Sequence, residues 1–208
     1  MSARQYFKKG KENFDKGNYK EALQKVTVAI KLTNEKSKYL ILYITFKVLC
    51  LLNLDRNKLA KKELTKLMEI DVKDEDSFYR RGLCSLFLDN FEESIGDYNE
   101  AIKLNPKNAV YFYGRSEGYC GLEKFEKAIA DISKAIKLDS KNAVYFFKRS
   151  EYLYKQKMYK KSIADISKAI KLDSKNAVYF FKRSEYLYKQ EMYKKSIADI
   201  SKAIKLDS

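Results

Sequence analysis

The residues of this chain that could do chemistry are carboxylates, cysteines and arginines, because the 208 residues include no histidine. Histidine is the usual general base and metal ligand near neutral pH, so its absence disfavours most hydrolytic and zinc chemistries. Glutamates recur one repeat apart, as Glu117, Glu151 and Glu185. Two carboxylates that act on one bond must lie close together, and this spacing is too wide. Neither GxxxxGK[ST] nor HExxH occurs, so the sequence predicts a protein that is not an enzyme.

The three cysteines, Cys50, Cys84 and Cys120, are odd in number and form no CxxC pair. This pattern argues against a disulfide framework and against a zinc site. We expect small buried or groove-lining side chains instead. Neither a metal nor another cofactor is expected.

A 34-residue repeat is the strongest pattern in the chain. Residues 129–174 match residues 163–208 at every position except one, where Lys157 stands against Glu191. Periods of this length indicate stacked structural units, each of which buries its apolar face against its neighbours. In the late units, apolar and small residues lie three and four apart in both halves, which predicts two amphipathic helices per unit.

Large and small side chains alternate at fixed positions of the repeat, as close helix packing requires. The large positions hold Phe78, Phe112, Phe146, Phe180, Phe91, Phe125, Tyr159 and Tyr193. The small positions hold Gly82, Ser116, Ser150, Ser184, Ala101, Ala135, Ala169 and Ala203.

Arginine and aspartate recur together at a spacing of 16 residues in the last four units. The arginines are Arg81, Arg115, Arg149 and Arg183, and the aspartates are Asp97, Asp131, Asp165 and Asp199. A catalytic role is one interpretation of these pairs. We favour structural pairing between the two helices of a hairpin, because a repeated charge near a helix interface needs a partner.

In these positions the chain resembles the tetratricopeptide repeat family, with an aromatic at position 4, small residues at 8 and 20, and alanine at 27. The resemblance covers essentially the whole chain and is clearest in the third unit, which has Phe78, Gly82, Tyr98, Ala101 and Pro106. It implies an all-α solenoid of about six helix-turn-helix repeats in a right-handed superhelix. The predicted units of this single array, residues 1–208, are 3–36, 37–74, 75–108, 109–142, 143–176 and 177–208. The second unit is atypical, and we place about four extra residues in its turn around Leu54–Asn57.

The family resemblance also implies a concave groove lined by the first helix of each unit, and hence a scaffold or adaptor that binds a peptide or protein segment. The groove positions follow helical spacing and form one stripe. Their candidate binding residues are Tyr113, Glu117, Val144, Phe147, Lys148, Glu151, Tyr154, Lys155, Val178, Phe181, Lys182, Glu185, Tyr188 and Lys189. Aromatic anchors ringed by charge are typical of interfaces. The alternative for Phe147 and Phe181 is packing between adjacent units.

A standard chaperone carboxylate clamp is disfavoured. At the five clamp positions that the resemblance implies, the chain has Phe7, Lys11, Leu42, Asp76 and Arg80, of which one matches.

The net charge of +15 raises a second hypothesis. Interleaved lysine and tyrosine suit RNA or another polyanion, because cations neutralise phosphates and aromatic faces stack on bases. Lysine-rich faces are also often only solvated, so we rank protein binding first.

End-to-end self-association is a third hypothesis, because the last predicted hairpin carries no polar capping helix, and a truncated array fits equally well. The N-terminus has no secretory signal. The longest apolar run, residues 39–54, contains Lys47 and is too short for a bilayer span. We therefore expect a cytoplasmic protein.

Overall fold

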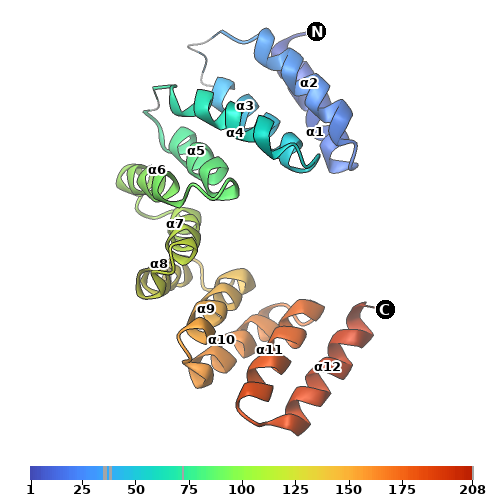
Figure 1. The fold of residues 1–208 in the computed structure, drawn as a ribbon, viewed down its shortest axis with the longest axis vertical. Coiled ribbons are helices and arrows are strands. Elements are labelled where there is room, and N and C mark those ends of the chain that lie inside the picture. Colours follow the sequence, from blue (N-terminus) through green and yellow to red (C-terminus); the bar gives the residue numbers. More distant parts are fainter. Residues whose placement is uncertain (35–36, 38, 72, 208) are drawn as a thin grey trace. The chain divides into compact units, whose positions relative to one another are not determined.

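The computed structural model describes residues 1–34, 37, 39–71 and 73–207. In this part of the chain there are twelve α-helices and no strands, which confirms the prediction of an all-α fold made of helix-turn-helix repeats (Figure 1). The helices fall into two compact units, Met1–Pro106 and Lys107–Ser208. Each unit is described by itself.

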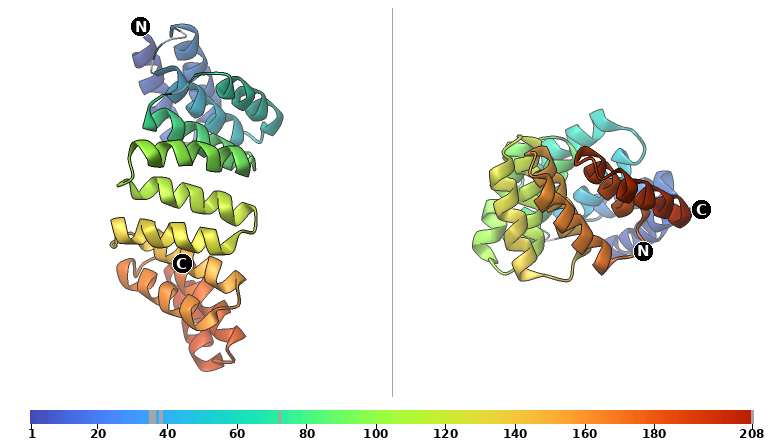
Figure 2. Two further views of the ribbon diagram at one scale, coloured as in Figure 1. Left: turned by 90° about the vertical axis from the view of Figure 1, so that its left-hand side faces the viewer. Right: turned by 90° about the horizontal axis from the view of Figure 1, so that it is seen from below.

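Each unit contains three helical hairpins, in which consecutive helices run antiparallel (Figures 1 and 2). Unit 1 consists of α1 (Ala3–Asp15), α2 (Tyr19–Lys31), α3 (Tyr39–Leu52), α4 (Asn57–Met68), α5 (Glu75–Phe87) and α6 (Phe91–Leu104). Unit 2 consists of α7 (Ala109–Gly121), α8 (Phe125–Leu138), α9 (Ala143–Lys155), α10 (Tyr159–Leu172), α11 (Ala177–Lys189) and α12 (Tyr193–Asp207).

Side-chain caps fix where the first helix of each hairpin in unit 2 begins. Asn108, Asn142 and Asn176 each accept a hydrogen bond of 3.1 Å from the backbone N–H two residues later. This contact satisfies one of the N–H groups that have no partner within the helix. The asparagines recur every 34 residues, so the repeat of the sequence sets the repeat of the helices.

A left-handed residue ends the turn inside each hairpin. The φ angles are 54° at Asp55, 59° at Asp89, 56° at Glu123, 60° at Lys157 and 58° at Glu191. The first hairpin has a glycine there, residue 17, with a φ of 77°. A left-handed conformation costs an L-residue about 1 to 2 kcal/mol, whereas glycine adopts it freely. The one mismatch between the last two repeats, Lys157 against Glu191, therefore falls at the position that adopts the left-handed conformation of the turn.

The extra residues of the second hairpin do not lie in its turn, which corrects the register predicted from the sequence. Asp55 stands 34 residues before Asp89, as in the later repeats, so the turn itself is regular. Gly17, by contrast, stands 38 residues before Asp55. The four added residues therefore lie between Gly17 and Asp55, before the turn of the second hairpin.

The small positions of the repeat are where the two helices of a hairpin approach each other, as predicted. The predicted serines and alanines are all buried, and Ala101, Ala135 and Ala169 are fully so. A Cβ atom on Gly82 would lie 3.1 Å from that of Asp97 and 3.4 Å from the Ser94 carbonyl oxygen. Close-packed interiors tolerate little added volume, so these positions must stay small.

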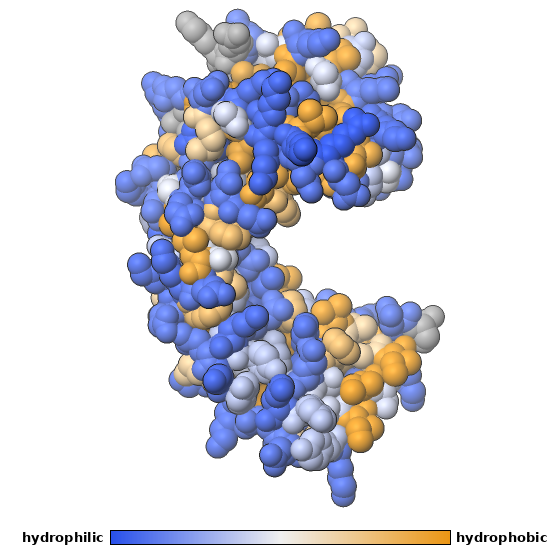
Figure 3. Space-filling model, viewed as in Figure 1, coloured by the Kyte–Doolittle hydropathy of each residue, from blue (hydrophilic) through white to orange (hydrophobic). Residues whose placement is uncertain are grey.

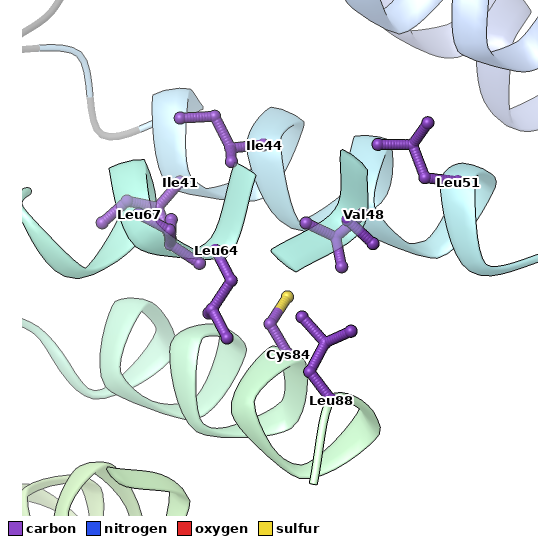
Figure 4. Close-up of a cluster of buried hydrophobic side chains, with 9 residues drawn as sticks. Ile41, Ile44, Val48, Leu51, Leu64, Leu67, Cys84 and Leu88 are labelled. Atoms are coloured by element: carbon purple, nitrogen blue, oxygen red, sulfur yellow. The ribbon is translucent and has the colours of Figure 1, made fainter. Parts of the chain in front are cut away.

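The core of unit 1 is aliphatic around α3, α4 and α5 (Figure 4). Ile44, Val48 and Leu64 are buried there together with Cys84. Burial raises the pKa values of the Cys50 and Cys84 thiols to about 12, which keeps both neutral and unreactive. Cys120 is half-buried, so the cysteines are small packing side chains as expected. No helix among the described residues is long and apolar enough to cross a membrane.

The turn geometry predicts that lysine-to-glycine substitutions at two nearby positions change the free energy of unfolding in opposite directions. Lys157→Gly should raise the free energy of unfolding by about 1 kcal/mol, because glycine relieves the left-handed strain. Lys160→Gly, in the first turn of α10, should lower it by about 1 kcal/mol. Urea denaturation of the intact chain measures both changes. A loss of stability in both variants would contradict the role given to this turn.

Candidate functional site

The predicted groove residues lie together on α7, α9 and α11, which form the first-helix surface of unit 2. Three valines mark the first turns of these helices, and the exposed fractions are 37% for Val110, 39% for Val144 and 53% for Val178. Lys155 and Lys189 are exposed at the opposite ends of α9 and α11. The surface thus has an apolar edge and a cationic edge.

A charged cluster occupies this surface between α7 and α9. The Lys148 ammonium lies 3.3 Å from Glu117 Oε2 and 3.3 Å from Glu151 Oε2. The Tyr152 hydroxyl donates a hydrogen bond to the Glu117 carboxylate. Partners within the chain therefore satisfy much of the charge at this point.

The pKa values in the cluster follow from burial and from these charges. Burial alone would lower the pKa of Lys148, but Glu117 and Glu151 outweigh it and raise the pKa. Burial raises the pKa of Tyr113 to about 12, and the Glu117 charge acts in the same direction. Burial also raises the pKa of Tyr152, with Glu117 again adding to the effect. Near neutral pH the lysine is therefore charged and both tyrosines are neutral.

Aromatic pairs link the first helices of successive hairpins. The ring centroids of Phe147 and Tyr179 are 5.0 Å apart, and those of Tyr154 and Tyr186 are 4.5 Å apart. Such pairs contribute roughly 0.5 to 1.5 kcal/mol beyond the area they bury. Phe147 therefore packs between adjacent hairpins, as the alternative interpretation of this residue predicts.

The equivalent aromatics on α11 are open. Phe181 is 49% exposed and Tyr188 is 60% exposed, although they occupy the same repeat positions as Phe147 and Tyr154. Both rings line a cavity of about 350 Å³. The cavity is completed by Tyr154, Ser184, Glu185, Lys189, Ser196 and Ile200. Glu185 also pairs with Lys182 at 2.9 Å, so this cavity combines aromatic walls with a charged rim.

Sequence reasoning missed Tyr152 and Tyr186, which are 2% and 3% exposed and lie between adjacent first helices. Their hydroxyls interact with the preceding hairpin, Tyr152 at Glu117 and Tyr186 at Ser150. The only signal in the sequence is a change of residue type at one repeat position. That position holds Gly118 in the unit before Tyr152, and replacing glycine with tyrosine adds a bulky side chain.

The predicted arginine–aspartate pairs are confirmed in all four hairpins. Their shortest N···O distances are each 2.6 Å. Each guanidinium also lies 5.7 or 5.8 Å from the centre of the phenylalanine ring three residues earlier. Planar guanidinium groups suit both contacts, so lysine could not replace arginine equally well.

In unit 2 two of the arginines also join one hairpin to the previous one. Arg149 donates to Ser133 Oγ on α8 at 3.0 Å, and Arg183 donates to Ser167 Oγ on α10 at 3.1 Å. Each arginine therefore connects three helices. These contacts account for the arginines structurally.

The second hairpin has a different charged pair at the same spacing. Lys47 contacts Glu63 at 3.0 Å, across α3 and α4. In the register predicted from the sequence, with the second unit at residues 37–74, the arginine position falls on Tyr43 rather than on Lys47. Tyr43 is instead buried against Phe7, with ring centroids 4.6 Å apart. Phe7 thus fills a packing position where the clamp would need a lysine.

The hairpin geometry defines the chain as a member of the helical-hairpin repeat proteins. Residues 75–108, which form α5 and α6 with the loop that follows, match the sequence model of the tetratricopeptide repeat. The described residues contain five further hairpins of the same build, so the chain has the fold of a tetratricopeptide-repeat array. No curated protein matches its sequence.

Similar solved structures carry the same fold at low sequence identity. A tetratricopeptide repeat protein from Parabacteroides merdae is 17% identical, with 98% of this chain and 79% of that chain covered and a TM-score of 0.73. PilF from Pseudomonas aeruginosa is 16% identical, with 95% and 88% covered and a TM-score of 0.73. YrrB, described as having an unusual peptide-binding site, is 18% identical, with 87% and 91% covered and a TM-score of 0.59.

The arginine–aspartate pair predicts a non-additive loss of stability. Asp165→Ala should lower the free energy of unfolding by about 2 kcal/mol, because Arg149 is left largely buried without its counter-ion. The double variant Arg149→Leu with Asp165→Ala should lose roughly 1 kcal/mol less than the single variant. Chemical denaturation of the three chains measures the difference. Equal losses would show that the pair is not the source of the effect.

Proposed function

We propose that this chain is a non-enzymatic scaffold that binds a peptide or protein segment on the first-helix surface of unit 2. Tetratricopeptide-repeat folds are in general protein-interaction scaffolds. The observation that carries the proposal is the open aromatic pair of Phe181 and Tyr188 around the cavity of about 350 Å³. The contacts made by the equivalent residues of the previous hairpin support it.

Those equivalents indicate what the open rings would bind. Phe147 and Tyr154 each contact a tyrosine of the next first helix, whereas Phe181 and Tyr188 are 49% and 60% exposed. The Lys182 ammonium lies 6.0 Å from the centre of the Phe181 ring. Aromatic side chains give a large contact area for few frozen rotamers, which makes them frequent interface anchors. A partner segment with an aromatic or large aliphatic side chain would fill the place of that tyrosine.

The surroundings favour an extended segment over a small molecule. The exposed valines continue the apolar surface from α11 back to α9 and α7, and the two exposed lysines flank it. An apolar centre with a charged rim is typical of protein interfaces. YrrB, which shares the fold, is itself described as a peptide-binding protein.

Selection of random displayed peptides on the intact chain tests this proposal. For a selected peptide, Phe181→Ala with Tyr188→Ala should weaken binding by about thirtyfold, as expected for hot-spot residues. Phe87→Ala serves as the control, because that ring is also about half exposed but lies on α5 in unit 1. Fluorescence anisotropy gives the dissociation constants. Peptides that bind the double variant and the wild type equally would place the site elsewhere.

Self-association is a second candidate, and the outer face of α12 favours it. The helices α10 and α12 share their sequence from Tyr159 to Ser174 and from Tyr193 to Ser208. In α10, Ile166 and Ile170 are 0% and 9% exposed, whereas Ile200 and Ile204 in α12 are 39% and 65% exposed. Figure 3 shows this apolar face along α12. Two copies could bury it by packing α12 against α12 about a twofold axis.

Substitutions on this face separate the second candidate from the first. Ile197→Lys with Ile204→Lys should convert a concentration-dependent dimer to a monomer, because charges on both helices would be buried unpaired. Leu138→Lys, a substitution at an exposed leucine of α8, should leave the dimer intact. Analytical ultracentrifugation gives the masses. A wild-type chain that stays monomeric at high concentration would remove this candidate.

The other sequence hypotheses stay predictions. They are binding of RNA or another polyanion, a cytoplasmic location, and one continuous array over residues 1–208. The selection of displayed peptides would identify the sequence and the charge of the segments that this surface binds.

A further inference from the structure

A second surface of unit 2, formed by the second helices α8, α10 and α12, contains a cavity. It measures about 530 Å³ and lies between α8, the end of α9 and the start of α10. Ile129, Leu153 and Met158 give it an apolar wall. Cavities of this size with mostly apolar walls are typical ligand sites.

The charged groups at the base of this cavity are already paired. Arg149 contacts Asp165 at 2.6 Å and Ser133 Oγ at 3.0 Å. On one edge the Gln156 amide donates a hydrogen bond to Glu126. The interior therefore suits an apolar group rather than a charged one.

The rim beside the cavity is strongly basic. A second hollow of about 300 Å³ adjoins it and shares Met158 and Lys161 with it. Lys157 and Lys160 complete the cationic lining of this hollow. All three lysines are exposed, and no acidic residue occurs between Gln156 and Ala164. An apolar cavity thus lies directly beside three positive charges.

The same cavity recurs one hairpin later, which bears on the class of ligand. Ile163, Leu187, Met192 and Lys195 line a cavity of about 350 Å³, and each stands 34 residues after its counterpart in the first cavity. A small molecule would fill only one cavity. A polypeptide is the ligand that can place successive side chains in a series of repeated cavities.

We propose that the second-helix surface of unit 2 binds an acidic peptide segment. An apolar side chain of the segment enters the cavity beside Met158, and carboxylates on either side of it contact Lys157, Lys160 and Lys161. Charge complementarity of this kind guides association and fixes the register of the bound chain. The site does not depend on the first-helix surface, so the two surfaces can be tested separately.

The test uses the intact chain and three labelled probes. The first is a peptide in which glutamates flank leucines, the second replaces each leucine by serine, and the third is oligouridylate. Fluorescence anisotropy at about 0.15 M salt gives the dissociation constants under screening that weakens nonspecific charge attraction. The leucine peptide should bind about tenfold more tightly than the serine peptide, because only leucine fills the cavity. Equal binding of the two peptides, tighter binding of the oligouridylate, or no binding of the leucine peptide would overturn the proposal.

Matched variants locate the binding site. Lys160→Glu with Lys161→Glu should weaken binding of the leucine peptide by about tenfold or more. Lys168→Glu with Lys171→Glu changes the net charge equally on the same helix, but outside both hollows, and should weaken it by less than about threefold. Equal losses in the two charge-reversed chains would overturn the proposal.

A third variant tests the cavity itself. Met158→Ser removes the apolar side chain but keeps a favourable residue at the start of α10, so the helix should form normally. It should reduce the preference for leucine over serine to about twofold or less. Circular dichroism confirms that each variant is folded. An unchanged preference in folded Met158→Ser would show that the leucine does not enter this cavity.

Discussion

The ion pair between the two helices of a hairpin is the interaction on which the late repeats depend. In each of the last four hairpins an arginine contacts an aspartate at 2.6 Å and lies over a phenylalanine of its own helix. A guanidinium group has a fixed planar geometry, so these contacts set the rotation of the two helices about each other. Because Arg149 and Arg183 also reach a serine of the preceding hairpin, one side chain sets both the hairpin and its stacking.

This framework leaves different surfaces open in hairpins that have nearly the same sequence. Phe147 and Phe181 are copies, yet one packs against a tyrosine and the other is half exposed. What a residue does in such an array is determined by whether another hairpin follows it in space. The two proposed sites differ in this respect: the first-helix site uses aromatics that are about half exposed, and the second-helix site uses cavities between adjacent hairpins.

Much of the fold could be predicted from the sequence because the same pattern of residues recurs in several units, which identifies helices and contacts that one unit alone would leave uncertain. Four copies of an arginine and an aspartate at one spacing identify a contact that a single pair would not. The second hairpin could not be placed in this way, since Lys47 and Glu63 replace the usual pair and the added residues lie before its turn. The left-handed conformation of Asp55 shows that the turn is regular, and a φ angle cannot be read from the residue types.

The candidate site was less predictable, because periodicity gives the face of a helix but not what covers that face. The sequence placed Glu117, Phe147 and Lys148 on a binding stripe, whereas in the structure each makes contacts within the chain. Tyr152 and Tyr186 were missed because the role of a tyrosine at a position that elsewhere holds glycine cannot be inferred until the neighbouring helix is known.

The paired serine and arginine contacts have a consequence for the length of the protein. Joining Asn142 directly to Ala177 would bring Arg183 opposite Ser133, which is chemically the same junction as the one it makes with Ser167. Unequal recombination within this stretch could therefore add or delete a whole hairpin without creating a single new side-chain contact, so copy number is the property of this chain that is free to vary.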